Sequence, residues 1–295
     1  MSNQKLLVTG ASGFLGWNLC RIASNVRRVF GTARSRPESI PAGVSPLIVD
    51  LTAESERRRM LEESAPDALI HLAAASKPNY CQLHPRQTHR LNVDAAVALA
   101  ELCASMGIGF VFASSDQVYD GNNAPYTEST PPSPVNVYGE QKAEAERLIR
   151  DRNPSAVICR MPLMFGDPSP SAGSFIQPFL ASLKSGRPIR LFADEYRTMV
   201  GAQSAARGLL WTAGLKGRLL NLGGKERLSR YEFGLRLAAA AGADSSLVEA
   251  NRQCEVAMPA PRPSDVSMDS SAAFALGYNP LPVDEELARL SCLNE

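Results

Sequence analysis

The sequence predicts an α/β protein built on a doubly wound parallel sheet, with a smaller C-terminal α/β portion. In the first half of the chain, short apolar runs alternate with longer segments whose apolar residues recur every three or four positions, as in repeated strand–helix–strand units. After about Met161 this rhythm gives way to a Gly/Ser/Pro-rich stretch at residues 166–173. We therefore expect a larger domain over residues 1–162 and a smaller one over residues 163–295, between which the chain may cross back.

Each expected element follows from its residue pattern. Strands are predicted where short runs of apolar and β-branched residues are bounded by turn residues, at Lys5–Thr9, Arg28–Ala33, Pro46–Asp50, Ala68–Ala73, Phe110–Ser114 and Ala156–Arg160. Helices are predicted from the longer apolar period, at Phe14–Ser24, Glu54–Glu63, Gln87–Met106, Val137–Asp151, Phe175–Lys184, Gln203–Ala213 and Arg230–Ala241. Right-handed crossovers place the carboxyl ends of parallel strands along one edge, where we expect a ligand to bind.

Composition argues against several classes of protein. Lys and Arg total 31 against 30 Asp and Glu, a net charge of +1 that offers no field for nucleic acid or an anionic membrane. No stretch approaches the roughly 20 apolar residues of a membrane span, and the N-terminal segment lacks a secretory pattern, so we expect a soluble, cytoplasmic protein. Six cysteines without a C-x-x-C pair suggest neither a metal site nor a disulfide framework.

A glycine-rich turn follows the first predicted strand and opens the first predicted helix. Gly10 would permit the tight turn, Gly13 would let the backbone approach a pyrophosphate, and Gly16 would let helix and strand pack closely. The N-terminus of that helix would offer free N–H groups to the anion. The pattern is typical of a Rossmann-type dinucleotide site, the alternative being a plain glycine-rich turn.

The end of the second strand predicts which dinucleotide binds. An acidic residue here would bind the ribose 2′-hydroxyl of NAD, but the sequence has Arg34, with Arg36 behind it. A guanidinium can offer two parallel donors to a phosphate. We therefore expect NADP(H), with NAD(H) possible; the alternative is that both arginines are solvated loop charges.

A tyrosine and a lysine four residues apart form a candidate catalytic pair. Tyr138 and Lys142 begin a predicted helix and would share one face. A phenol with a pKa near 10 is a poor acid–base catalyst at neutral pH, and a neighbouring cation such as Lys142 would lower that pKa. The spacing alone often arises by chance. The Ser114-Ser115-Asp116 run at the end of the fifth strand strengthens it, because both elements reach the edge where the glycine turn lies.

These motifs resemble the extended short-chain dehydrogenase/reductases and, within them, most closely the dTDP-4-dehydrorhamnose reductases. The similarity covers nearly the whole chain. It is carried by Thr9–Gly16, residues 71–75, Asn92, residues 114–121, Pro125, Tyr126, Glu128, Tyr138–Lys142, and residues 160–166, 230–233 and 262–269.

The resemblance implies roles for individual residues. Ser115 would hydrogen-bond the substrate carbonyl, Tyr138 would donate the proton, and Lys142 would also hold the nicotinamide ribose. His71, inside an apolar strand, would have only a structural role. The implied cofactor-binding residues are Gly10, Ser12, Gly13, Phe14, Leu15, Gly16, Arg34, Asp50, Leu51, Leu72, Ala73, Ala74, Tyr138 and Lys142.

Asp116 and Gln117 help to select the reaction. Related nucleotide-sugar dehydratases have Asp-Glu at this position, and Gln117 cannot ionise to act as their base. The epimerase/reductases that make GDP-fucose have a cysteine at Gln117, and simple 4-epimerases lack the acid at Asp116. The best fit is therefore reduction of the 4-keto group of a nucleotide-activated deoxy sugar.

The substrate is less defined than the reaction class, because residues 75–85 and 197–201 depart from the reductase pattern. In relatives these segments contact substrate or build dimer surfaces, so a homodimer stays open. Substrate contacts are predicted for Ser76, Asp116, Gln117, Arg197 and Arg262, with Lys77 a further candidate for a diphosphate or sugar; the three cations could equally be simple surface charges. Alternative functions are a non-catalytic NADP-binding regulatory subunit, a nucleotide-sugar 4-epimerase, or a reductase of a non-nucleotide carbonyl.

Overall fold

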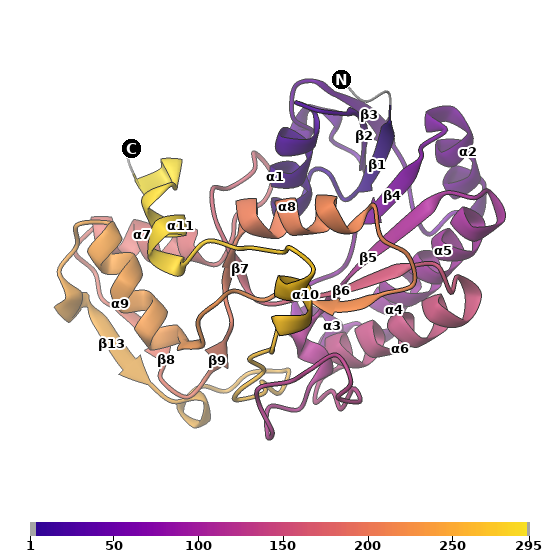
Figure 1. Ribbon diagram of the computed structural model, residues 1–295. Coiled ribbons are helices and arrows are strands. Elements are labelled where there is room, and N and C mark those ends of the chain that lie inside the picture. Colours follow the sequence, from indigo (N-terminus) through magenta and orange to yellow (C-terminus); the bar gives the residue numbers. More distant parts are fainter. Residues whose placement is uncertain (1–3, 294–295) are drawn as a thin grey trace.

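A computed structural model describes residues 4–293; the few terminal residues beyond them, which belong to the two expected domains, lie outside the described part. Its centre is a seven-stranded parallel sheet in the order β11-β6-β5-β4-β1-β2-β3, with helices on both faces (Figure 1). Six of these strands follow the 3-2-1-4-5-6 order of the Rossmann fold. The predicted doubly wound α/β architecture is confirmed.

The strands of this sheet lie close to the predicted ones. They are β1 Lys5–Thr9, β2 Arg28–Ala33, β3 Val44–Ile48, β4 Ala68–His71, β5 Gly109–Ser115, β6 Val157–Met161 and β11 Leu219–Asn221. Two predicted strands, Pro46–Asp50 and Ala68–Ala73, extend two residues too far. After β4 the chain leaves the ladder because the Thr9 side-chain oxygen accepts the N–H groups of Leu72 and Ala73, at 3.2 and 3.4 Å.

The helices around the sheet show one clear departure from the prediction. The helices are α1 Phe14–Ala23, α2 Glu54–Ser64, α3 Pro78–Leu83, α4 Pro85–His89, α5 Ala96–Ser105, α6 Val137–Arg152 and α8 Ala202–Thr212. The single helix expected over Gln87–Met106 is instead α4, a wider π-type segment η2 (Arg90–Ala95) and α5. Within η2 the Asn92 side chain bonds both backbone groups of Ala75, at 2.8 and 3.1 Å. Such π-bulges often lie at functional sites.

Two hydrophobic layers sandwich the sheet. On β1, Leu6 and Val8 belong to the layer that includes α1 and α8, whereas Leu7 belongs to the layer that includes α2 and α5. Alternate residues of a strand point to opposite faces, so a strand covered on both sides must be apolar throughout. This explains why β1 is a continuous apolar run.

The C-terminal portion packs beside the carboxyl edge of the sheet, at the left of Figure 1. Its elements are β7 Met164–Phe165, α7 Ile176–Lys184, β8 Ile189–Phe192, β9 Tyr196–Arg197, β10 Val200–Gly201, β12 Leu228–Ser229, α9 Arg230–Ala240, β13 Val248–Asn251, α10 Ser271–Ala275 and α11 Val283–Ala288. Phe165, Leu180 and Phe233 lie in its core. The chain also returns to the seven-stranded sheet and its helices, because α8 packs on α1, β11 pairs with β6 and α10 packs on β11.

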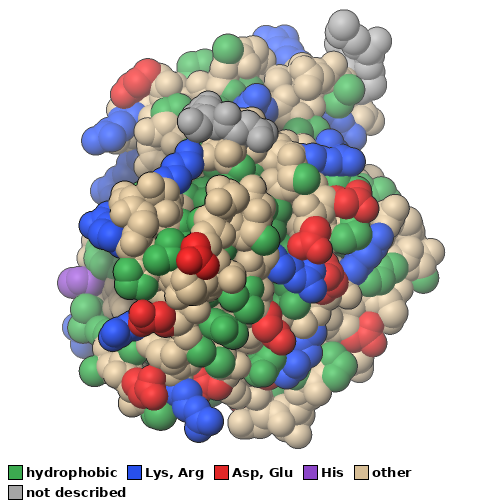
Figure 2. Space-filling view, turned by 90° about the vertical axis from the view of Figure 1, so that its left-hand side faces the viewer, with side chains coloured by type: hydrophobic (Ala, Val, Ile, Leu, Met, Phe, Trp, Pro, Cys, Tyr) green, Lys and Arg blue, Asp and Glu red, His purple; other side chains and the backbone are tan. Residues whose placement is uncertain are grey.

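The outer face of this portion carries charges of both signs. In Figure 2, basic and acidic side chains alternate over the visible face, with apolar groups between them. Within residues 4–293, no helix combines the length and apolar character needed to cross a bilayer.

Candidate functional site

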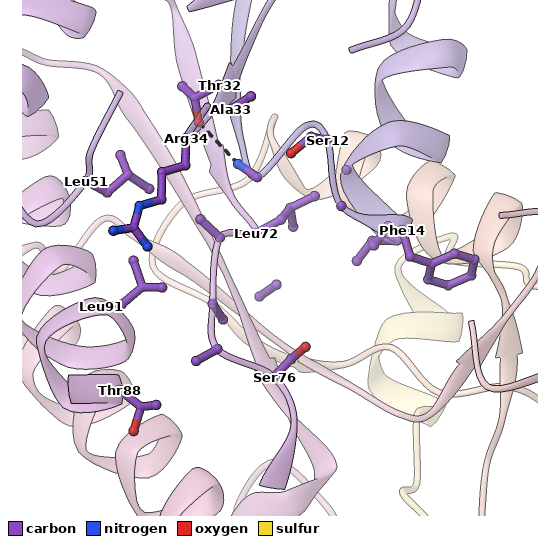
Figure 3. A pocket seen from close by; sticks show the side chains of 18 of the residues that line it. Ser12, Phe14, Thr32, Ala33, Arg34, Leu51, Leu72, Ser76, Thr88 and Leu91 are labelled. Carbon is purple, nitrogen blue, oxygen red and sulfur yellow. Dashed lines mark hydrogen bonds between the residues drawn. The ribbon is translucent and has the colours of Figure 1, made fainter. Parts of the chain in front are cut away.

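A cavity of about 660 Å³ opens at the carboxyl edge of the sheet (Figure 3). All residues predicted to bind the cofactor line it: Gly10, Ser12, Gly13, Phe14, Leu15, Gly16, Arg34, Asp50, Leu51, Leu72, Ala73, Ala74, Tyr138 and Lys142. Of the residues predicted to touch substrate, only Ser76 is among them. Ser115, Asp116, Gln117, Arg197 and Arg262 do not line this cavity, although the Ser115 hydroxyl is close enough to Tyr138 to affect the pKa of the phenol.

The glycine turn is fitted to a bound anion. Gly10 has φ of +70°, and a Cβ there would lie 2.9 Å from the backbone of Ala73. A Cβ on Gly16 would lie 2.1 Å from the Gly10 carbonyl oxygen. Gly13 is the N-cap residue of helix α1 and offers no side-chain cap, so the first N–H groups of the helix have no intrahelical partner. A turn without side chains next to such N–H groups fits the pyrophosphate of a dinucleotide.

The neighbouring strand ends are fixed by a buried histidine. His71 Nδ1 lies 2.8 Å from Thr9 Oγ1, and the ring stacks near Phe110 and Phe112. Burial, together with the charge of Lys142, lowers the pKa of His71 to about 3. The imidazole is therefore neutral near pH 7, which agrees with a structural role.

The cavity also holds a carboxylate, Asp50, within electrostatic reach of two arginines. Asp50 accepts hydrogen bonds from the backbone and hydroxyl of Thr52, at 2.9 and 2.7 Å. These bonds lower the pKa of Asp50, with smaller contributions from Arg34 and Arg90. Figure 3 shows the Arg34 side chain reaching between Leu51 and Leu91.

Helix α6 brings the candidate proton donor against the end of β5. The Asn136 side chain caps the helix by accepting the Gly139 N–H at 3.0 Å. A Cβ on Gly139 would lie 2.1 Å from the Gln117 carbonyl oxygen, so only glycine permits this close approach. The contact places Tyr138 within hydrogen-bonding reach of the Ser115 hydroxyl.

The electrostatics of Tyr138 and Lys142 differ from the prediction. The expectation that Lys142 lowers the pKa of Tyr138 is wrong, because burial raises the phenol's pKa and outweighs the opposing effect of the nearby Ser115 hydroxyl. The Lys142 ammonium instead donates to the Ala113 carbonyl at 2.6 Å and lies 4.3 Å from the Phe112 ring centre. Burial lowers the pKa of Lys142 to about 8, so the side chain is still mostly charged at pH 7.

Behind Ser115 lies a buried charged cluster. Asp116 accepts from the Ser115 hydroxyl at 3.2 Å and lies 3.5 Å from Arg197 Nε. Burial raises the pKa of Asp116 to about 6 against the opposing effect of Arg197. Arg197 also contacts Glu195 at 3.3 Å and donates to the backbone of Pro263. The Arg197 guanidinium is thus largely engaged within the protein.

The other predicted substrate residues surround this cluster. Gln117 accepts from the Asn136 amide at 3.1 Å, and Arg262 donates to Asn79 at 3.0 Å. Arg262 Nη1 is buried and has no hydrogen-bond partner within the described chain. That nitrogen has a donor left for a ligand. Lys77, the further candidate, is the residue directly before helix α3.

Several cavity residues were not predicted. They are Thr32, Ala33, Val49, Thr52, Tyr80, Gln87, Thr88, Arg90, Leu91, Ala113, Ser114, Met161 and Met164, whereas Ala75 was expected beside the dinucleotide together with Leu72. Arg90 is the most informative of these, and its position two residues before Asn92, which shares in the family resemblance, could have drawn attention to it. Arg230 was also missed: burial lowers its pKa to about 10, and Arg197 and Arg262 lie close enough to add to that effect.

Known proteins resemble this chain over nearly its whole length. A probable low-salt glycan biosynthesis reductase, Agl14, of Haloferax volcanii is 29% identical over 291 residues, covering 96% of each chain. The methionine adenosyltransferase 2 subunit beta of Bos taurus is 28% identical over 287 residues, covering 93% of this chain and 83% of the bovine one.

The fold and the family agree with these relatives. The crystal structure of a dTDP-4-dehydrorhamnose reductase from Bacillus anthracis in complex with NADP matches with a TM-score of 0.83 and 21% identity, covering 98% of both chains. The sequence profile of the RmlD substrate binding domain matches residues 4–291. The predicted resemblance is confirmed, and the chain belongs to the RmlD substrate-binding domain family.

Proposed function

We propose that this protein is an NADP(H)-dependent reductase of the 4-keto group of a nucleotide-activated deoxy sugar. The observation that carries the proposal is that Tyr138, Lys142 and the glycine turn line one cavity, with the Ser115 hydroxyl close enough to Tyr138 to affect the pKa of the phenol. The dinucleotide would be held by the glycine turn, by residues 72–74 and by Asp50 and Leu51. When bound, its reduced nicotinamide ring supplies the hydride.

The chain's own residues supply the proton and orient the substrate. Because burial raises its pKa, Tyr138 keeps its proton at neutral pH and can donate it to the carbonyl oxygen as that oxygen gains charge. Ser115 would hydrogen-bond the same oxygen and so fix its distance from the phenol. Lys142, charged at pH 7, would hold the nicotinamide ribose.

The charged cluster supports an anionic substrate beyond the carbonyl. Arg262 has a buried nitrogen without a partner in the described chain, and its charge is close enough to Arg230 to help lower the pKa of that guanidinium. Guanidinium groups suit diphosphates because they donate two parallel hydrogen bonds. We infer that these two arginines bind the nucleotide diphosphate, while Ser76, Asp116 and Gln117 face the sugar.

The proposal is tested by following NADPH oxidation at 340 nm with 4-keto-6-deoxy sugars carried on dTDP, UDP, GDP and CDP. We expect turnover with at least one of them. Tyr138→Phe should lower kcat by about 100-fold or more, since general acid catalysis contributes about 10²–10⁴, without weakening NADPH binding measured by fluorescence. Tyr231→Phe, at a partly buried tyrosine of α9 that does not line the cavity, is the matched control and should retain wild-type turnover.

A second function is favoured by one observation. The Bos taurus relative is named as a subunit of methionine adenosyltransferase and covers 93% of this chain. A regulatory role predicts tight NADPH binding, no turnover with any sugar of the panel, and association with a catalytic partner that Tyr138→Phe leaves intact. Turnover abolished by that substitution would contradict it.

A further inference from the structure

We infer that Arg90 and Arg34 together bind the 2′-phosphate of NADPH, which makes Arg90 a second residue that determines cofactor specificity. The inference rests on the proposed dinucleotide site and deepens it. Arg90 is the first residue of the π-type segment η2. It lies far in sequence from the strand end that normally selects between NAD and NADP.

The two guanidinium groups converge on the same part of the cavity. Arg34 follows β2 and reaches between Leu51 and Leu91 in Figure 3. Arg90 directly precedes Leu91, and both arginines line the cavity. Each also lowers the pKa of Asp50, which places both positive charges within electrostatic reach of that carboxylate.

Both charges are available to a ligand. The two arginines are exposed, and within residues 4–293 neither guanidinium forms a hydrogen bond or ion pair. Asp50 does not neutralise them by direct pairing, because its Oδ1 already accepts two hydrogen bonds from Thr52. Two unpaired cations therefore stand against one carboxylate, and the remaining positive charge favours an anionic phosphate.

The position of Arg90 is held by the fold. The π-type segment η2 is held in place by Asn92, whose side chain forms hydrogen bonds with Ala75 and, at 2.8 Å, with Gln141 of α6. A backbone fixed in this way keeps the base of the Arg90 side chain at the cavity, so no backbone ordering is needed on binding. Arg36, the second arginine expected from the sequence, does not line the cavity.

Binding of two small nucleotides tests this inference without any turnover. Titration calorimetry would compare 2′,5′-ADP, which carries the 2′-phosphate, with 5′-ADP, which lacks it. Arg90→Met keeps the aliphatic length and removes the charge. We expect it to weaken 2′,5′-ADP by about tenfold or more, because a hydrogen bond to a charged group contributes about 1.5–3 kcal/mol, and to change 5′-ADP by less than about twofold, since no charge-assisted bond is lost.

Controls separate the possible failures. Arg36→Met should leave both affinities unchanged, and equal thermal midpoints would show that Arg90→Met is folded. If Arg90→Met leaves 2′,5′-ADP binding intact or weakens both ligands equally, the inference is wrong while the dinucleotide site stands. If the wild-type protein binds neither nucleotide nor NADPH, the proposed function itself fails.

Discussion

At the scale of single residues, the site combines groups whose protonation is set by burial more than by partners. Asp116 shows this most clearly, since its pKa of about 6 lies above the ordinary 3.8 even though Arg197 opposes the change. A buried carboxylate lacks the hydration that it would have in water, and its neighbours do not fully replace that hydration, so burial disfavours the ionised form. The resulting instability has a defined dependence on pH.

Asp116→Asn should become relatively more stable as the pH rises. The folded protein holds the Asp116 proton more tightly than the unfolded chain does, so ionisation between pH 4 and 6 removes stability from the wild type. The asparagine variant cannot ionise. Urea unfolding at pH 4 and pH 7 should show its stability relative to wild type improving by up to about 3 kcal/mol.

Asp151, which forms an ion pair with Arg147, offers a control because its side chain is 60% accessible. Asp151→Asn should follow the wild type at both pH values. Parallel stability curves for wild type and Asp116→Asn would show that Asp116 ionises normally in the folded protein.

At the scale of elements, the first turn of α6 is the joint that assembles the site. The contact between Gly139 and the Gln117 carbonyl sets how far Tyr138 extends toward Ser115. A methyl group inserted there must push backbone, not a flexible side chain. The helix would then move away from the end of β5.

Gly139→Ala should therefore damage both stability and activity. We expect a loss of about 1–3 kcal/mol in unfolding free energy, as for other overpacked sites, and at least a tenfold fall in kcat/KM, since misplacement by about 1 Å can cost about 100-fold. Gly214→Ala is the control, because its nearest neighbour atom would be 3.7 Å away. Equal effects of the two substitutions would contradict the role of this contact.

The sequence predicted the elements whose form is decided locally. Gly10 and Gly16 are demanded by atoms within the turn or next to it, and β1 shows its burial in its own apolar run. The split of the predicted helix at Arg90 depends instead on Asn92 bonding to Ala75 and Gln141, 17 and 49 positions away. Local periodicity carries no information about such partners.

The same limit applied to the candidate site. The cofactor residues follow a motif and were all found at one cavity, whereas Arg90 and Arg230 acquire their meaning only from tertiary neighbours. The predicted effect of Lys142 on Tyr138 failed for a related reason. Spacing along a helix shows that two groups are near, but the sequence does not show how deeply the phenol is buried.

At the scale of the whole molecule, the seven-stranded sheet is completed by β11, which comes later in the chain than the first elements of the C-terminal portion. β11 pairs with β6, and its Asn221 amide donates to the carbonyls of Tyr126 and Asp269 at 2.9 and 3.0 Å. Helix α8 likewise covers α1 and the apolar layer beneath it. The seven-stranded sheet and its covering helices therefore depend on residues well beyond 162.

A fragment of residues 1–162 should consequently fail to fold cooperatively. It would expose the edge of β6 and the face of α1 that α8 covers, so we expect binding of a hydrophobic dye and a broad urea transition measured by circular dichroism. A fragment of residues 1–222 restores β11 and α8 and should gain native structure. A sharp transition for the shorter fragment would contradict this expectation.

The late position of β11 also matters while the chain is being made. Until residue 221 has left the ribosome, the growing protein carries an open strand edge and an uncovered apolar helix face. Synthesis proceeds at about 5–20 residues per second. That interval of several seconds is long enough for an unfinished chain to meet another, so assistance by a chaperone should raise the yield of active protein more than it raises the stability of the finished one.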